Sequence, residues 1–438
     1  MAKPIDIVFL YEKALRELDV ACVLKVMLER EGLSVAIIHQ DHDYGEALQH
    51  YRPRLVVLPF CYQNRSNNIY LLRWRDAVFV NLTWEQFFYP GNQKAKTPRG
   101  DFPLRHVMHF AWSRDYLRLL ADLGVPPARS FLSGNPALAL YRQPYRSYFK
   151  SRTELAAAHG LNPERRWVFF PENYNWAFYD ESMLRQMVAD GQSQAEVDAM
   201  RAFATRSFEA AMDWCRQLVV DTDIELILRP RPATVPAQMR LRVEERTGPL
   251  PPRFHILQEE TVREWILASD LIISSYSTSL IEAAVAGRPI LMLEPLLLPQ
   301  SLVQAWHHLV PRAREYPQLR QAVLAPMPQV AEPLASWAEG QLLSEGDPLS
   351  AMAHSLARLL RGETSPPPTA TRASVTWGCP TGVPLLAWWG WKYLRSFVSQ
   401  YKALSGIGHV PAADIVSDVA AKKTVAERCA HWKACLPP

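Results

Sequence analysis

Five serine and threonine side chains stand within six residues, SSYSTS, between an apolar run and helical sequence. Hydroxyls and free N–H groups at the start of a helix bind phosphate, and the positive end of the helix dipole favours the anion. Ser279 and Glu282 fit the Ser-x-x-Glu capping box, and Gly287 with Pro289 predicts the end of the helix. The candidate phosphate ligands are Ser274, Ser275, Ser277 and Thr278. The alternative is a well-capped crossover helix in a domain that binds no nucleotide, with Glu282 only a cap.

Two arginines follow another apolar run in the turn LRPRP. Arg229 and Arg231 could each neutralise phosphate through paired N–H donors, without a metal ion. Neither can act as a general acid at neutral pH, because the pKa of arginine lies above about 12. The alternative is a pair of arginines in a solvated loop.

A third polar turn, ENYN, follows the apolar run Trp167–Phe170. Glu172 and Asn173 stand just past the carboxyl end of this predicted strand, where α/β folds place their ligands. Neighbouring aromatic side chains could stack on a base or a sugar ring; they are Tyr174, Trp176 and Phe178. The alternative is a polar turn that caps a helix, with the aromatic rings packed into the core.

Such turns meet only if the strands before them are parallel and share one sheet. Short apolar runs alternate with helical segments in both halves of the chain, which is typical of parallel sheets covered by helices. The predicted strands are Ile5–Leu10, Ser34–Ile38, Leu55–Leu58, Ala77–Leu82, His109–Ser113, Trp167–Phe170, Ile224–Leu228, Phe254–Leu257 and Leu271–Ile273. The predicted helices include Arg114–Leu123 and Ala195–Leu218. YEKALRE, rather than a GxGxxG turn, follows the first strand, so dinucleotide binding by the first half is poorly supported.

The block ASDLIISSYSTSLIEAAVAGRPILML, from Ala268 to Leu293, resembles the donor-binding signature of GT-B glycosyltransferases that build bacterial surface polysaccharides. The resemblance spans about residues 55 to 300 and includes transferases of CMP-activated keto-sugars. Nucleotide-sugar 2-epimerases and polyol-phosphate transferases carry close variants. It implies that the hydroxyl turn binds donor phosphate and that Glu282 binds the ribose. The family typically has Arg-Pro-His-Pro where this chain has Arg231 in place of the histidine, so phosphate binding is retained and proton donation is not.

The same resemblance places NLTWEQFF, from Asn81 to Phe88, at a turn that faces the cleft of such enzymes. Glu85 is then the first candidate for the carboxylate that deprotonates the acceptor hydroxyl, or for the nucleophile of a retaining reaction. Gln86 is a candidate acceptor contact. Asp101 is the second candidate carboxylate and Glu172 the third.

No metal site and no cofactor are expected. The HQDHD stretch, from His39 to Asp43, has the composition of a metal site but lies in one short loop, so a solvated turn is expected. His106 and His109 are expected to be packed side chains. The six cysteines show no CxxC pair or zinc spacing and predict reduced, buried thiols.

Composition and charge limit the classes of partner that this protein is expected to bind. A net charge of +4 is too small to argue for nucleic acid, but suits an anionic donor or membrane face. MAKPIDIVFL lacks the pattern of a signal peptide, and no run approaches the roughly 18 apolar residues that span a bilayer. A cytoplasmic protein is expected, at the inner face of the cytoplasmic membrane if the C-terminal region binds there.

That region contains the sequence VPLLAWWGWKYLRSFVSQYKAL, from Val383 to Leu404. Leu394, Phe397 and Tyr401 share one helical face, and three tryptophans stand beside basic residues. This pattern indicates membrane contact through residues 385–404, or else a helix that packs on the enzyme. The expected domains are 1–145 (acceptor-binding), 146–361 (donor-binding), 362–384 (a Pro-rich linker) and 385–438 (an aromatic and basic helix with a tail).

The expected fold is therefore α/β of the GT-B type, with two Rossmann-like domains whose parallel sheets face a central cleft, plus a C-terminal helical extension. The expected activity is metal-independent transfer of a sugar from a nucleotide-sugar donor, with CMP-Kdo favoured, to a glycan or lipid-linked glycan acceptor. The alternatives are a CDP-polyol phosphotransferase of the teichoic-acid type and a non-catalytic GT-B scaffold.

Overall fold

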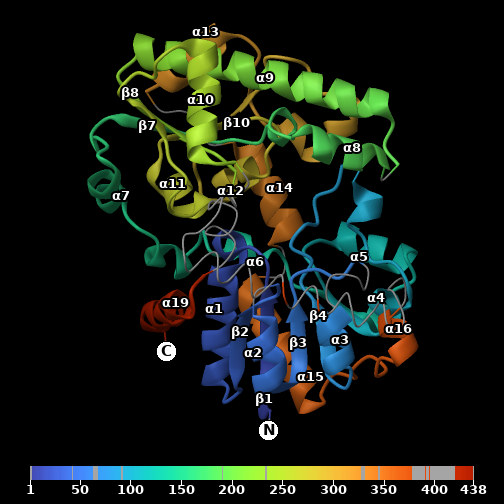
Figure 1. Cartoon of the computed structure of the whole chain (residues 1–438). Helices are drawn as coiled ribbons and strands as arrows, with labels where there is room; N and C mark the ends of the chain where they lie inside the picture. Colours follow the sequence, from blue (N-terminus) through green and yellow to red (C-terminus); the bar gives the residue numbers. More distant parts are fainter. Residues whose placement is uncertain are drawn as a thin grey trace. The chain divides into compact units, whose positions relative to one another are not determined.

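The computed structural model describes residues 2–376, except 42, 63–67, 90–91, 190, 232–233, 327–330 and 344–345, together with residues 390, 394 and 420–437. The chain divides into two compact units (Figure 1). Unit 1 contains Met1–Tyr148 and Glu339–Pro438, and unit 2 contains Phe149–Ala338. Each unit is built on a parallel sheet of six strands, which confirms the prediction of two Rossmann-like α/β domains.

The sheet of unit 1 has the strand order β2-β1-β3-β4-β5-β6, and every neighbouring pair is parallel. Its strands are β1 (Lys3–Tyr11), β2 (Val35–His39), β3 (Tyr51–Leu58), β4 (Val78–Asn81), β5 (Val107–Ala111) and β6 (Ser130–Leu132). The central strands are buried apolar runs, as expected of a sheet covered on both faces. All five strands predicted in the first half are present.

Helices cover this sheet. They are α1 (Ala14–Arg30), α2 (Tyr44–His50), α3 (Asn68–Arg73), α4 (Asp101–Arg105), α5 (Arg114–Asp122) and α6 (Pro136–Ala139). Short 3₁₀ turns lie at Gln93–Ala95 (η1), Pro127–Arg129 (η2) and Tyr145–Tyr148 (η3). Ser113 begins α5 by accepting a hydrogen bond from the backbone N–H of Tyr116.

The C-terminal part of the chain completes unit 1. The helix α14 (Glu332–Leu342) leads back into it, and α15 (Pro348–Arg361) packs against α1 and α6. Residues 363–371 form neither helix nor strand, and the helix α16 (Arg372–Thr376) follows. Ala370 and Val375 are buried in the core of unit 1 beside α3. Part of the segment expected to be a linker is therefore packed, and residues 339–361, which the sequence assigned to the donor domain, belong to unit 1.

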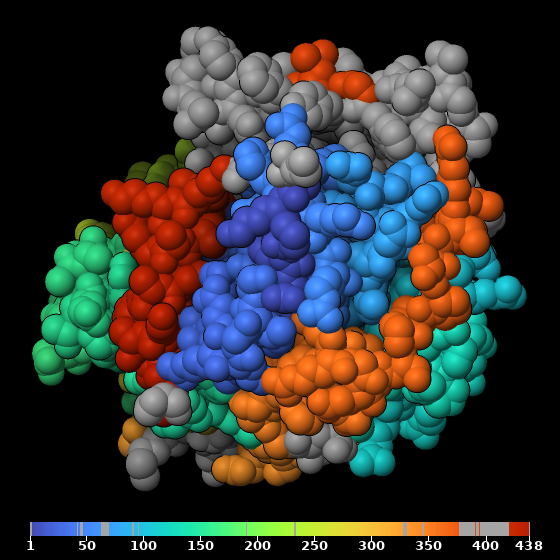
Figure 2. Space-filling model, turned by 90° about the horizontal axis from the view of Figure 1, so that it is seen from below, coloured from blue at the N-terminus to red at the C-terminus, as the bar shows by residue number. Residues whose placement is uncertain are grey.

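The last helix, α19 (Lys422–Cys435), lies along α1 (Figures 1 and 2). The C-terminal helical extension is therefore present. The segment 385–404 lies outside the described residues apart from Gly390 and Leu394, whose side chain is half exposed. In the described part of the chain, no helix is both long enough and apolar enough to cross a membrane.

The sheet of unit 2 has the strand order β12-β11-β10-β7-β8-β9, again with parallel pairs throughout. Its strands are β7 (Arg166–Pro171), β8 (Ile224–Arg229), β9 (Phe254–Ile256), β10 (Leu271–Ser274), β11 (Ile290–Leu293) and β12 (Arg312–Ala313). The order turns at β7, because β8 continues on one side of it and β10 lies on the other. Ligands of open α/β sheets bind outside the carboxyl ends of strands at such a turning point.

Helices also cover the sheet of unit 2 (Figure 1). They are α7 (Arg152–His159), α8 (Glu181–Ala189), α9 (Gln194–Asp221), α10 (Pro236–Thr247), α11 (Val262–Ala268), α12 (Ser279–Val285) and α13 (Tyr316–Leu324). Short 3₁₀ turns lie at Asn175–Ala177 (η4), Gln300–Leu302 (η5) and Ala305–Leu309 (η6). The long α9 begins at a capping box of Ser193 and Glu196 and buries Phe208, Cys215 and Leu218 against the sheet.

Candidate nucleotide-binding site

Three of the predicted polar turns meet at the carboxyl edge of the unit 2 sheet. Pro171 at the end of β7 is in register with Arg229 at the end of β8, and Ser274 ends β10 on the other side of β7. The backbone N–H of Glu172 donates to the carbonyl of Arg229, 3.0 Å away. The Ser274 hydroxyl donates to the carbonyl of Pro171 at 2.6 Å. Neighbouring strands lie about 4.8 Å apart, so the turns after β8 and β10 are about 10 Å apart, within reach of one nucleotide.

In the hydroxyl turn after β10, some hydroxyl groups are bonded within the protein, and two backbone N–H groups are available to a ligand. Ser274 is fully buried, and its hydroxyl is used in the bond to β7. The Ser277 hydroxyl donates to the Ser279 hydroxyl at 3.2 Å and accepts from the Ser279 N–H at 3.3 Å. Within the described residues, the backbone N–H groups of Ser277 and Thr278 donate no hydrogen bond. These two half-buried positions therefore offer free N–H donors to an anion.

The predicted capping box of this helix is wrong. The N-cap of α12 is Thr278, whose side chain makes no capping hydrogen bond, and Ser279 is already helical. The N–H groups of Leu280 and Ile281 are bonded to backbone carbonyls of the turn. Because α12 has only seven residues, its dipole adds little. The groups that an anion could bond to here are the turn's own amides and hydroxyls.

The two arginines of LRPRP have different roles. Arg229 is buried, and its guanidinium donates to the carbonyls of Gln258 and Glu260 at 3.3 and 3.0 Å. It braces the loop after β9. Arg231 is half-buried, and its carbonyl accepts from the Gln258 amide at 2.7 Å. Among the described residues, its guanidinium makes no hydrogen bond, and it faces the charge of Glu172.

Glu172 is a buried carboxylic acid at the end of β7. One of its oxygens accepts the backbone N–H of Tyr174, and the other, Oε2, has no hydrogen-bond partner within the described residues. Burial raises the pKa of this carboxyl, against the opposing effects of the Tyr174 N–H, the Arg231 charge and the Arg231 backbone N–H. An unpaired buried oxygen costs free energy unless a ligand or water bonds to it.

The remaining candidates of unit 2 fall around this edge. Asn173 is half-buried beside Glu172, and Glu282 is half-buried on α12. The three aromatic candidates have different surroundings. Tyr174 packs on Phe208 in the core, with ring centroids 5.9 Å apart. Phe178 packs on the same ring at 5.1 Å, which leaves only the half-buried Trp176 for stacking.

Sequence reasoning missed Glu294, the residue directly after β11 at the same edge of the sheet. It is buried and paired with Arg312 at 2.9 Å and Arg314 at 2.7 Å. Burial raises its pKa, but the two arginines outweigh burial, and the pKa of the carboxyl is lowered. The signal was present in the sequence, since a carboxylate directly follows the apolar run ILML.

Glu85 lies in unit 1, after the end of β4. The backbone between them turns sharply at Thr83, which is buried with φ of +48°. Glu85 forms ion pairs with Arg16, at 3.3 Å, and with Lys96. Burial raises the pKa of Glu85, but Lys96 and Arg16 outweigh it, and the pKa is lowered. Glu85 is therefore an ionised carboxylate, as a base must be.

The other polar residues of this region have structural partners. Gln86 donates to the Phe110 carbonyl at 3.0 Å and accepts from the Trp112 N–H at 2.8 Å, so its amide joins the ends of β4 and β5. This occupies the groups proposed for acceptor contact. Asp101, the first residue of α4, pairs with Arg105 and His106 at 3.4 Å each.

The histidines fit structural roles. His109 is buried between Asn81, at 3.2 Å, and the Pro103 carbonyl, at 2.8 Å. Burial lowers its pKa to about 4, so it is a neutral packed side chain, as expected. His39 of the HQDHD stretch is buried rather than solvated, and its Nε2 lies 3.0 Å from the Glu12 carbonyl. His42 lies outside the described residues, and those that are described hold no group of three potential metal ligands.

Comparison with known proteins identifies the fold. No protein-family model matches the chain, and no curated protein sequence matches it. Solved structures do: a putative UDP-N-acetylglucosamine 2-epimerase from Listeria monocytogenes has a TM-score of 0.50 at 14% identity, over 84% of this chain and 99% of that one. The H444N variant of the wall teichoic acid polymerase TagF has a TM-score of 0.53 at 12% identity, over 83% and 90%. A further UDP-N-acetylglucosamine 2-epimerase has a TM-score of 0.51 at 12% identity, over 85% and 100%. The chain has the two-domain α/β fold of these GT-B-type proteins.

Proposed function

We propose that this protein is a GT-B-type transferase that moves a sugar from a nucleotide-activated donor to a hydroxyl of a bacterial surface glycan or lipid-linked glycan. One observation carries the proposal: the carboxyl edge of the unit 2 sheet gathers several polar groups that the described residues leave unbonded. They are the N–H groups of Ser277 and Thr278, the guanidinium of Arg231 and Oε2 of Glu172. Two amides and a guanidinium suit a phosphate, and a carboxylate oxygen suits a hydroxyl donor such as a ribose.

Each group then has a role in the reaction. Arg231 and the turn amides neutralise the donor phosphate, which carries more negative charge once the nucleotide has left. Glu85, held ionised by Lys96 and Arg16, takes the proton of the acceptor hydroxyl. The acceptor oxygen bonds to the anomeric carbon, and the bond from that carbon to the phosphate oxygen breaks. Since Arg231 gives up no proton, the nucleotide must leave as an anion that its positive charge stabilises.

A donor with a single phosphate, such as a CMP-linked keto-sugar of the Kdo type, fits this arrangement best, because one arginine can neutralise most of its charge. The resemblance of the hydroxyl turn and LRPRP to transferases of such donors supports the same choice. Because the fold is similar to that of TagF, a second candidate function is transfer of a polyol phosphate from a CDP donor. Arg231, which cannot donate a proton, counts against it.

A thermal-shift screen of CMP, CDP, UDP and GDP tests the proposal. Stabilisation by CMP alone supports a CMP-sugar donor, by CDP a polyol phosphate donor, and by UDP or GDP another sugar donor. If no nucleotide raises the melting temperature, the chain is a non-catalytic scaffold.

Arg231→Ala tests the site itself. Loss of a charged hydrogen bond to phosphate is expected to weaken binding of the stabilising nucleotide by about 1.5–3 kcal/mol, or roughly 10- to 150-fold. Arg240→Ala is the matched control, because Arg240 is exposed on α10 and pairs only at 3.5 Å with Glu244. Equal affinity of the two folded variants, measured by calorimetry, removes the phosphate assignment.

A further inference from the structure

Two cysteines from opposite ends of the chain meet where α19 packs on α1. Cys22 lies on α1 and Cys429 on α19, and their sulfur atoms are 3.0 Å apart. Both are free thiols, Cys22 fully buried and Cys429 9% exposed. The sulfurs are about 1 Å farther apart than in a disulfide, where the bond is about 2.0 Å long. Forming the bond would need only a small movement.

The surrounding contacts hold the two helices in this register. The indole of Trp432 is fully buried and stacks on Tyr148, with ring centroids 3.8 Å apart and planes at 2°. Its N–H donates to Asp19 on α1 at 3.2 Å, and Arg428 pairs with the same carboxylate at 3.3 Å. Arg30 of α1 donates to the carbonyl of Leu436, just past α19, at 3.1 Å. The two thiols are therefore held together by contacts on both sides of them along α19.

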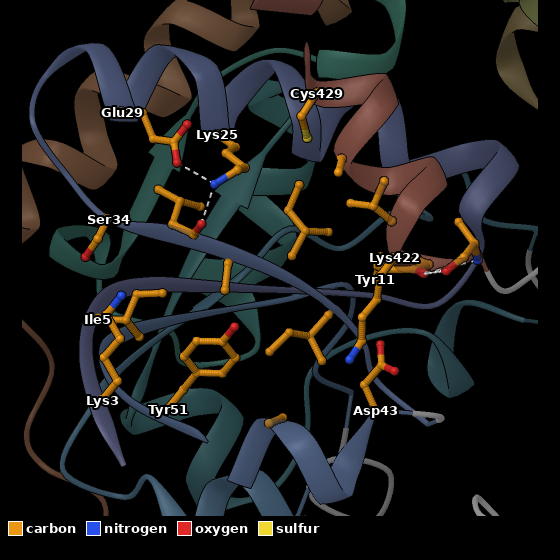
Figure 3. A pocket seen from close by; sticks show the side chains of 18 residues that line it. Lys3, Ile5, Tyr11, Lys25, Glu29, Ser34, Asp43, Tyr51, Lys422 and Cys429 are labelled. Atoms are coloured by element: carbon orange, nitrogen blue, oxygen red, sulfur yellow. Dashed lines mark hydrogen bonds and ion pairs between the residues drawn. The ribbon is translucent and has the colours of Figure 1, made fainter. Parts of the chain in front are cut away.

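A cavity gives access to this pair of thiols. It has a volume of about 440 Å³ and lies between the edge strand β2 and α19 (Figure 3). Cys429 lines it, together with Val425 and Lys422 of α19 and Lys25 of α1. Lys25 is held by Glu29 and by the carbonyl of Val35. A small molecule in the cavity would reach the sulfur of Cys429 before that of Cys22.

The two thiols also differ in acidity. Their mutual hydrogen bond lowers the pKa of Cys429 and raises that of Cys22. Burial opposes the lowering at Cys429, but the hydrogen bond and the charge of Lys25 outweigh it. Cys429 is thus the thiol that ionises first, and the thiolate is the form that attacks a disulfide.

We propose that Cys22 and Cys429 form a reversible dithiol–disulfide site, which fastens α19 to α1 when a small-molecule disulfide enters the cavity. The Cys429 thiolate attacks one sulfur of that disulfide, giving a mixed disulfide and releasing one thiolate. Cys22 then gives its proton to the released thiolate and attacks the sulfur of Cys429, and the second small thiolate leaves and takes up the proton that Cys429 lost to water when it ionised. The two protein thiols are oxidised by two electrons, and the small disulfide is reduced to two thiols.

The bond would close a chain loop that includes unit 2 and residues 377–419. Its expected effect is to prevent α19 from separating from α1, since a disulfide removes open conformations of the chain. α19 would then remain a fixed wall of the cavity. This role is independent of nucleotide binding in unit 2.

The test incubates the full chain with oxidised glutathione, alkylates the remaining thiols and maps the peptides by mass spectrometry without reduction. A cross-link between the peptides of Cys22 and Cys429, two hydrogens lighter than their sum and lost on adding dithiothreitol, is expected. Cys435→Ser is the matched control and should leave the cross-link unchanged, because Cys435 lies on the same helix about 1.7 turns beyond Cys429. Cys429→Ser should abolish it. Alkylation of both Cys22 and Cys429 after oxidation, or a cross-link through Cys435, overturns the proposal.

Hydrogen exchange then tests what the bond does. In the oxidised protein the amides of α19 are expected to exchange at least about tenfold more slowly than in the reduced protein, while those of α9 in unit 2 do not change. Because this comparison uses the same chain in two redox states, it does not depend on whether a cysteine variant folds. Equal exchange of α19 in the two states contradicts the fastening role even if the cross-link forms.

Discussion

Glu85 is a carboxylate whose reactivity is set by two cations, Arg16 and Lys96. Arg16 is itself held by the buried Glu17 at 2.5 Å and by Glu12 at 3.3 Å, so it is fixed from several sides. Such bracing keeps Glu85 ionised at neutral pH and fixes its direction. A base that is held in this way needs no reorganisation before it takes a proton.

We expect Glu85→Gln to bind nucleotide normally and to turn over at least about 10² times more slowly, because the amide accepts no proton. We expect Lys96→Met to move the acid limb of the pH–rate profile upward, towards the ordinary carboxyl value of 4.5. Because the pKa of Glu85 is lower in the folded protein than in the unfolded chain, its ionised form stabilises unit 1 at pH values above the pKa of the unfolded chain. That stabilisation is lost as the pH falls through the pKa of the folded protein. Near-normal turnover of Glu85→Gln would shift the role to Asp101 or Glu172.

Glu172 shows the opposite electrostatics, because burial raises its pKa. Its protonated form is favoured in the folded state, so the folded protein loses stability as the pH rises through the folded pKa. Glu172→Gln keeps the acceptor oxygen for Tyr174 N–H and has no charge to bury. We therefore expect this variant to have a more stable unit 2 at pH 7, by an amount that vanishes below about pH 4.5.

Urea unfolding followed over a range of pH measures this difference. Glu245→Gln, at an exposed position on α10, is the control and should follow the wild type. If Glu172→Gln is less stable than the wild type at pH 7, Arg231 and the neighbouring N–H groups stabilise the carboxylate by more than its burial costs.

Among the elements, the strands could be predicted because a buried parallel strand is specified by its own residues. The apolar runs around Ile272 and Ile227 could be recognised as strands from their own residues, and every predicted strand is present in the structure. The polar groups at the carboxyl edge of unit 2 were predicted by the same rule, since they follow those runs. Their availability was not predictable, because it depends on long-range partners: Ser274 bonds to Pro171, and Arg229 to Gln258 and Glu260.

The C-terminal elements show the limit of local reasoning more sharply. Nothing in the composition of the Pro-rich segment indicates that Val375 fills a gap beside α3. The same holds for α15, whose amphipathic face would suit either unit and packs on α1. Such contacts join residues that are more than 300 positions apart, and no window of sequence contains both partners.

The docking of α19 leads to a prediction about this element. Trp432→Ala removes a fully buried indole, its stack on Tyr148 and its bond to Asp19. We expect it to reduce the free energy of unfolding of unit 1 by about 3–5 kcal/mol and to speed hydrogen exchange throughout α19. Lys433→Ala, one residue on and exposed, is the control. A loss below about 1 kcal/mol would mean that α19 contributes little to unit 1.

At the scale of the whole molecule, attachment to a membrane is still a prediction. Trp388, Trp389 and Trp391 lie outside the described residues, within the segment proposed to contact lipid. We expect replacement of all three by alanine to abolish binding to vesicles with anionic lipid and to leave the melting of both units unchanged. Vesicles without anionic lipid are the reference. Equal vesicle binding by the wild type and the triple variant would contradict the lipid contact.

Unit 2 is continuous in sequence, whereas unit 1 is made from the two ends of the chain. A ribosome releases the first part of unit 1 long before α15, α16 and α19 exist. The surface of α1 that α15 and α19 cover, including Cys22 and Asp19, is therefore exposed while unit 2 is synthesised and folds. The nascent protein thus has a period in which unit 2 is complete and unit 1 is open to chaperones, to aggregation and to oxidation of an uncovered thiol.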